Sequence, residues 1–110
     1  MPELLPEIRR IAVDETYDPG TRRQAAVRIA YLEKGPAVIL RRIEEHDHDN
    51  MLFLCRLAWM KDLLGARAAY ERCAERAPDE KCRTWCGRFA AKAKEAEAAG
   101  EPLSARPRPA

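Results

Sequence analysis

The chain has 110 residues, of which 46% are hydrophobic and 35% charged, a composition that fits one folded domain and argues against extended disorder. Twenty basic and eighteen acidic residues leave a formal net charge of +2, which by itself predicts neither a nucleic-acid nor a membrane partner. Aromatic residues make up only 6% and glycine occurs five times, so the composition favours helices over strands.

Two helices are expected in the first third of the chain. Residues 3–15 place their apolar side chains at helical spacing, which predicts an amphipathic helix. The turn signal Asp18-Pro19-Gly20 follows, and Thr21 with Gln24 three residues later has the spacing of a capping box. A second helix is therefore expected from Thr21 to about Lys34, where a glycine and a proline end it.

The rest of the chain predicts four more helices. Pro36 begins one with a wide aliphatic face, and the acidic run at 46–50 ends it. Residues 51–64 are apolar nearly all round, which predicts a helix at the centre of the core. A fifth helix follows, and a sixth begins after Asp79 and runs to about Ala99.

The last part of the chain has a different composition. Residues 90–100 offer only alanine for apolar contact, so this end of the sixth helix is expected to project into solvent. Residues 101–110, EPLSARPRPA, predict a flexible tail. The expected fold is all-α, with five or six short antiparallel helices in a single helical domain over residues 1–100.

Residues 18–50 have the pattern of two short helices enclosed by acidic turns. The pattern consists of an acidic-proline turn, an arginine-rich helix with small residues, a glycine turn, an aliphatic helix and an acidic end, namely Asp18-Pro19, Arg22-Arg23, Ala25-Ala26, Leu32, Gly35-Pro36, Val38-Ile39-Leu40, Ile43 and Asp47 to Asp49. This segment resembles a HEAT-type repeat in its short bacterial form, although no second repeat with an arginine-rich opening follows at Asp49.

A second partial resemblance lies in residues 66–78. Ala66, Tyr70, Cys73 and Pro78 stand at the spacing of alanine, aromatic, alanine and proline in the second helix of a tetratricopeptide repeat. Both families are stacks of helical hairpins, so the resemblance implies a small right-handed stack of this kind. The alternative architecture is a compact six-helix bundle.

The family resemblance implies binding rather than catalysis. In such repeats the second helix of each hairpin lines the binding surface, which points to Arg41, Arg42 and Glu45 in this chain. The expected function is a non-catalytic protein–protein interaction module, an adaptor or an inhibitor acting through a helical surface. The expected partner is another protein or a second copy of the chain, because a short stack leaves a terminal apolar face uncovered.

Nucleic-acid binding is the alternative function. Five basic residues follow one another without an acidic residue between them, with Trp85 and Phe89 interleaved, and a stripe of this kind can meet phosphates. The stripe consists of Lys81, Arg83, Arg88, Lys92 and Lys94. Nucleic acid is the less favoured partner because the chain as a whole is nearly neutral.

Cysteine and histidine provide two candidate metal sites. Cys73, Cys82 and Cys86 suggest a structural zinc site, with Cys55 or a histidine as a further ligand. Zinc needs about four ligands and a straight helix supplies two at most, so the favoured interpretation is core packing. Residues 46–49, His-Asp-His-Asp, alternate imidazole and carboxylate, but an extended turn points them to opposite sides. No metal or cofactor is expected.

Catalysis and membrane insertion are not expected either. Ser104 is the single serine, and neither a phosphate-binding glycine loop nor a marked pair of carboxylates occurs. The chain has no run of roughly 18 apolar residues and no secretory signal, so a cytoplasmic location with free thiols is expected. Arginine outnumbers lysine fifteen to five, a bias common in GC-rich bacteria and their phages.

Overall fold

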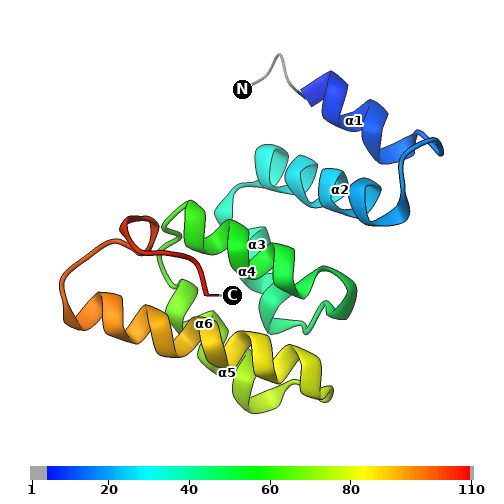
Figure 1. Cartoon of the computed structure of the whole chain (residues 1–110). Coiled ribbons are helices and arrows are strands. Elements are labelled where there is room, and N and C mark those ends of the chain that lie inside the picture. Colours follow the sequence, from blue (N-terminus) through cyan, green and yellow to red (C-terminus); the bar gives the residue numbers. More distant parts are fainter. Residues whose placement is uncertain (1–4, 110) are drawn as a thin grey trace. The chain divides into compact units, whose positions relative to one another are not determined.

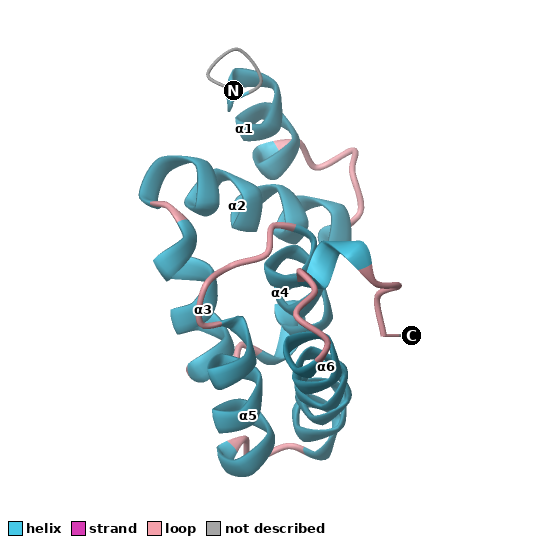
Figure 2. Cartoon of the chain, turned by 90° about the vertical axis from the view of Figure 1, so that its left-hand side faces the viewer, coloured by secondary structure: helices cyan, strands magenta, loops and turns pink. Residues whose placement is uncertain are grey.

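The computed structural model describes residues 5–109, which contain helices and no strand (Figures 1 and 2). The all-α prediction is confirmed, and 76% of the described residues are helical. Within residues 5–109 no helix has the length and apolar character needed to cross a bilayer. The elements are α1 (Leu5–Val13), α2 (Pro19–Lys34), α3 (Pro36–Glu44), α4 (Met51–Met60), α5 (Ala66–Arg76) and α6 (Glu80–Ala98), with 3₁₀ turns at His48–Asn50 and Leu103–Ala105.

Helix α2 begins earlier than the capping-box spacing predicts. The N-cap is Asp18, whose carboxylate accepts hydrogen bonds from the backbone N–H of Thr21 at 2.9 Å and from its hydroxyl at 2.8 Å. Pro19 occupies the first turn, where its missing N–H leaves no donor unpaired. The capping box of Thr21 and Gln24 was therefore wrong, because the acidic-proline turn is itself the start of the helix.

The junctions around α3 and α4 follow the sequence signals more closely. Gly35 adopts a φ of 87° and donates its N–H to the carbonyl of Tyr31, so a single residue separates α2 from α3. Helix α4 ends at Met60 rather than at residue 64, because Asp62 takes a left-handed φ of 50° that a helix cannot continue through.

Contacts between Cα atoms divide the chain into two compact units, Met1–Ile39 and Leu40–Ala110, here called unit 1 and unit 2. One domain can contain two compact units, so the single helical domain over residues 1–100 stays a prediction. In unit 1, α1 packs against α2, and an ion pair of 2.9 Å joins Arg9 to Glu33. The sequence placed the start of the first helix at residue 3, which lies outside the described residues.

The core of unit 2 is built around three aromatic rings. Trp59 and Phe89 meet edge to face with centroids 5.8 Å apart, and Tyr70 lies 5.3 Å from Phe89. The Tyr70 hydroxyl donates a 2.7 Å hydrogen bond to the backbone carbonyl of Cys55, which satisfies the one polar atom of this buried ring. The predicted central position of α4 agrees with its burial, because six of its ten residues are buried.

The alanine-rich end of α6 is packed, which corrects the expectation that it projects into solvent. Ala93 and Ala96 are buried, and α6 makes its most extensive contact with α5, which runs beside it (Figure 2). Helix α5 contributes Ala66 and Ala69 to its own buried face. Small side chains allow two helices to approach closely, so alanine is sufficient where both partners are small.

Candidate interaction surfaces

Arg41, Arg42 and Glu45 lie at the C-terminal end of α3. Arg41 and Glu45 are exposed and Arg42 is half-buried. The N–H of Glu45 donates to the Arg41 carbonyl at 2.8 Å, which continues the helical pattern and keeps these two side chains on one side. Their neighbour Glu44 forms an ion pair with Arg72 of α5, so charged side chains of two helices meet next to the predicted site.

The five basic residues of the predicted stripe divide into two groups on α6. Because an α-helix turns about 100° per residue, Lys81, Arg88 and Lys92 share one flank of the buried face, here called the basic flank. Arg83 and Lys94 lie on the opposite flank, and the guanidinium of Arg83 donates to the carbonyl of Ala77 at 2.8 Å. The structure therefore brings three of the five residues together.

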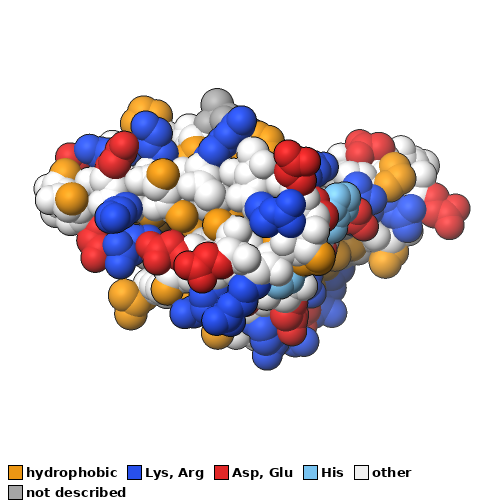
Figure 3. Space-filling model, turned by 90° about the horizontal axis from the view of Figure 1, so that it is seen from below, with side chains coloured by type: hydrophobic (Ala, Val, Ile, Leu, Met, Phe, Trp, Pro, Cys, Tyr) orange, Lys and Arg blue, Asp and Glu red, His pale blue; other side chains and the backbone are white. Residues whose placement is uncertain are grey.

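An aromatic ring lies within the basic flank. The guanidinium carbon of Arg88 stands 5.2 Å from the ring centroid of half-buried Trp85, a cation–π geometry. The charge of the flank is partly balanced, because Lys92 pairs with Glu95 at 3.4 Å. Figure 3 shows acidic side chains lying among the basic ones on one face of the protein.

The four cysteines are buried in unit 2. The sulfurs of Cys55 and Cys86 are 4.0 Å apart, and the Cys86 thiol points to the thioether of Met51 at 3.5 Å. Among the described residues no three or more His, Cys, Asp or Glu side chains form a group that could hold a metal ion. The zinc hypothesis on Cys73, Cys82 and Cys86 therefore gains no support, and the thiols fill the core as small apolar groups.

The surroundings of Cys73, Cys82 and Cys86 raise the pKa of their thiols and keep them protonated. A hydrogen bond with Cys86, together with burial, raises the pKa of Cys73, and contact with Cys55 raises the pKa of Cys86. Burial is the main cause that raises the pKa of Cys82 to about 12, with Asp79 as a second cause. Because the thiolate is the reactive form, these groups are poor nucleophiles at neutral pH.

The acidic turn after α3 serves to end and begin helices. His46 takes a φ of 60° and donates its N–H to the carbonyl of Ile43, which closes α3. His48 lies 3.3 Å from Asp49 and 3.8 Å from Asp79, the N-cap of α6. The His48 imidazole therefore lies near the first turn of α6, and the divergence of the alternating residues stays a prediction.

Helix α1 is an amphipathic helix without any buried residue. Leu5, Ile8 and Ile11 of its apolar stripe are half-buried, and Val13 at its end is 73% exposed. A nine-residue helix with this pattern normally covers its apolar side against a core. Within unit 1, the described residues therefore leave the apolar stripe of α1 only partly covered.

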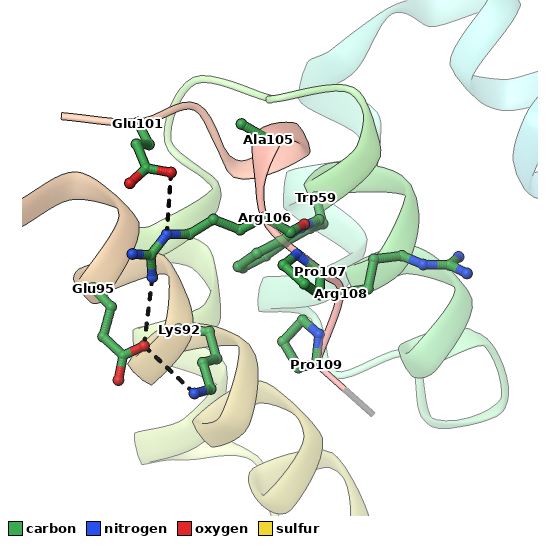
Figure 4. A pocket seen from close by; sticks show the side chains of 9 residues that line it. All are labelled: Trp59, Lys92, Glu95, Glu101, Ala105, Arg106, Pro107, Arg108 and Pro109. Carbon is green, nitrogen blue, oxygen red and sulfur yellow. Dashed lines mark hydrogen bonds and ion pairs between the residues drawn. The ribbon is translucent and has the colours of Figure 1, made fainter. Parts of the chain in front are cut away.

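The C-terminal segment contacts α4 and α6, a feature that the prediction of a flexible tail does not contain. The Trp59 indole N–H donates to the Arg106 carbonyl at 3.2 Å, and the Arg106 guanidinium lies 3.6 Å from Glu95 and 3.5 Å from Glu101 (Figure 4). The Ser104 N–H donates to Asp62 at 2.8 Å, and its hydroxyl donates to the other carboxylate oxygen. The predicted flexibility of residues 101–110 stays a prediction.

Sequence reasoning did not find this contact. The available signal was the repeated arginine-proline pair at residues 106–109, together with the acidic residues near the end of α6.

Comparisons with protein-family models, with curated proteins and with solved structures found no match to this chain. The surfaces of the two units are therefore the basis for a proposed function.

Proposed function

We propose that this chain is a non-catalytic protein–protein interaction module, an adaptor or an inhibitor that acts through its helical surface in the cytoplasm. The observation that carries the proposal is α1, whose apolar stripe contains no buried residue. Exposed apolar surface on an ordered helix is stabilised by contact with another protein, because burial removes that surface from water. The partner is another protein or a second copy of this chain.

The resemblance to HEAT-type and tetratricopeptide repeats supplies the candidate residues. Arg41 and Glu45 are exposed and Arg42 is half-buried, so all three can contact a partner. A stack of helical hairpins is the architecture that we propose on the same grounds, with a compact six-helix bundle as the alternative. Either architecture can present the end of α3 to a binding partner.

Affinity capture from a bacterial extract, quantified by mass spectrometry, tests the proposal. The double variant Arg41→Glu with Arg42→Glu should lose at least nine-tenths of the partner that the unchanged protein enriches, as a reversal of two contacting charges costs about 1.4 kcal/mol or more. The matched control is Lys61→Glu with Arg76→Glu, two exposed residues of unit 2 with the same change in net charge.

Two further measurements complete the test. Circular dichroism should show the same helix content in both double variants, because neither changes a buried residue. Light scattering of the pure protein over a range of concentrations detects a second copy as partner. A monomer that enriches no protein from the extract would refute the proposed function, and equal enrichment by both double variants would reject Arg41 and Arg42.

Nucleic-acid binding is a second candidate because Arg88 stacks on Trp85 between Lys81 and Lys92. Single-stranded nucleic acid binds surfaces that combine stacking rings with cations, and its affinity falls steeply with salt. Arg88→Ala should weaken binding of a labelled oligonucleotide about tenfold, whereas Arg83→Ala on the opposite flank should change it less. Absence of binding at low salt would remove this candidate.

A further inference from the structure

We propose that a groove in unit 2 recognises an extended arginine-proline segment of a partner protein and that the chain's own C-terminal segment occupies it in the free protein. The groove, here called the tail groove, is the surface that Trp59, Lys92, Glu95 and Glu101 present to the tail, and the tail lines the other side of the cavity that remains there (Figure 4). Its occupant is residues 103–109, here called the tail. None of Arg41, Arg42 and Glu45 takes part, so this proposal goes beyond the proposed function and is tested separately.

The way in which the tail lies in the groove is that of a bound proline-rich peptide. Arg106 has an extended backbone, with φ −114° and ψ 151°, as expected for a residue that precedes proline. Its carbonyl accepts the indole N–H of Trp59. Aromatic grooves of other proteins use the same combination, a ring for the prolines and a donor for a main-chain carbonyl, because an extended proline-rich chain offers acceptors and few donors.

Charge gives the groove its preference for arginine. Figure 4 shows the Arg106 side chain directed toward Glu95 and Glu101, while Arg108 points away from both carboxylates. The guanidinium of Arg108 instead lies 3.5 Å from the Met60 sulfur. Only Arg106 is therefore recognised through its charge, and Arg108 provides a matched control within the tail itself.

The tail fills the groove incompletely and is held by contacts that can be exchanged. A cavity of about 480 Å³ remains between Trp59, the end of α6 and the tail, within the range of peptide and small-ligand sites. The ion pairs of Arg106 lie at the surface, where such pairs contribute little net stability. Helix α6 ends at Ala98, and Gly100, whose φ of 69° turns the chain, lies between it and the tail, so the tail can leave without unwinding α6.

A binding experiment on the full chain tests the proposal. The probe is a fluorescently labelled synthetic peptide with the sequence of residues 103–109, titrated with protein and followed by anisotropy. In the unchanged protein the attached tail competes at an effective concentration on the order of millimolar, so the peptide should bind weakly. Arg106→Glu in the protein places a carboxylate next to Glu95 and Glu101 and should raise the peptide affinity about tenfold.

Three controls identify the source of the effect. Arg108→Glu in the protein should change peptide affinity less than threefold, because Arg108 points away from the carboxylates. A peptide carrying Arg106→Glu should bind the Arg106→Glu protein at least tenfold more weakly than the unchanged peptide does. Trp59→Phe, added to the Arg106→Glu protein, keeps an aromatic ring but removes the N–H, and should lower peptide affinity about three- to tenfold.

Several results would overturn the proposal. One is the absence of peptide binding to the Arg106→Glu protein at millimolar concentration while circular dichroism shows intact helices. Another is an equal gain in affinity from Arg106→Glu and Arg108→Glu. A third is a dimer of the unchanged protein, measured by light scattering, that disappears in the Arg106→Glu variant, since this would assign the groove to the tail of a second copy.

Discussion

The two units of the chain differ in what fills their interiors. Unit 2 buries three aromatic rings and all four thiols, whereas the buried side chains of unit 1 in the described residues are aliphatic. Those of unit 1 are Ala25, Val27, Ala30, Val38 and Ile39. Large rings bury more apolar area per residue than alanine or valine, so unit 2 holds the greater share of the stabilising surface.

The difference extends to the surface. Helix α1 of unit 1 has no buried residue, although it is amphipathic, while α6 of unit 2 buries five residues along one face. A helix that makes few buried contacts opens at a lower free energy than one that crosses a core. Two helices with equally clear sequence signals can therefore be buried to different extents, because burial depends on the volume of the side chains that meet in the core.

The largest expected effect is the loss of a central ring from unit 2. Phe89→Ala should lower the free energy of unfolding by about 3–5 kcal/mol, because it removes the ring that contacts both Trp59 and Tyr70. Urea denaturation followed by circular dichroism measures the change. A loss below about 1 kcal/mol would show that the three rings are not the main stabilising contact.

An intermediate effect is expected from the thiols at alkaline pH. Burial raises the pKa of Cys82 to about 12 in the folded protein, from 9.0 in an unfolded chain. Because the thiol then ionises more readily in the unfolded chain, the free energy of unfolding falls as the pH rises above 9. A thiol with this shift should lower the free energy of unfolding by roughly 1 kcal/mol between pH 9 and 10, because the unfolded thiol is only partly ionised at pH 9. Cys73 and Cys86 should act in the same direction.

Urea denaturation at pH 7, 8, 9 and 10 checks this dependence. In Cys82→Ala the free energy of unfolding should fall less steeply with pH, because one of the ionising thiols is absent. This difference in slope does not depend on the variant's stability at pH 7. A stability that stays level from pH 8 to 10 would contradict the protonated thiol core. Unit 1 contains no cysteine, so hydrogen exchange should report the alkaline opening in α4, α5 and α6.

The smallest effect is expected for an exposed valine of unit 1, and a buried valine of the same unit serves as the matched comparison. Val13→Ala should change the free energy of unfolding by less than about 0.5 kcal/mol, because this side chain is already 73% exposed. Val27→Ala should cost about 1–2 kcal/mol, because Val27 is fully buried. Thermal unfolding of both variants compares them directly, and equal losses would mean that the Val13 side chain is covered in solution.

The sequence predicted the helices well and the sites incompletely. The signals at Gly35-Pro36 and Asp79 set helix ends correctly, because proline, glycine and capping carboxylates act within a few residues. The basic stripe divided into two flanks once α6 gave each side chain its direction. The tail groove was not predicted, because Trp59 and Arg106 are 47 residues apart and no local rule connects them.

By itself, the sequence determined the all-α class and the order of helices, since apolar spacing and turn residues are local properties of the chain. Only the tertiary structure decided that the alanines of α6 are buried beside α5, that four thiols meet in one core and that Arg106 lies between two carboxylates. The physical reason is that burial and charge pairing depend on which distant segments meet, and composition leaves that choice open.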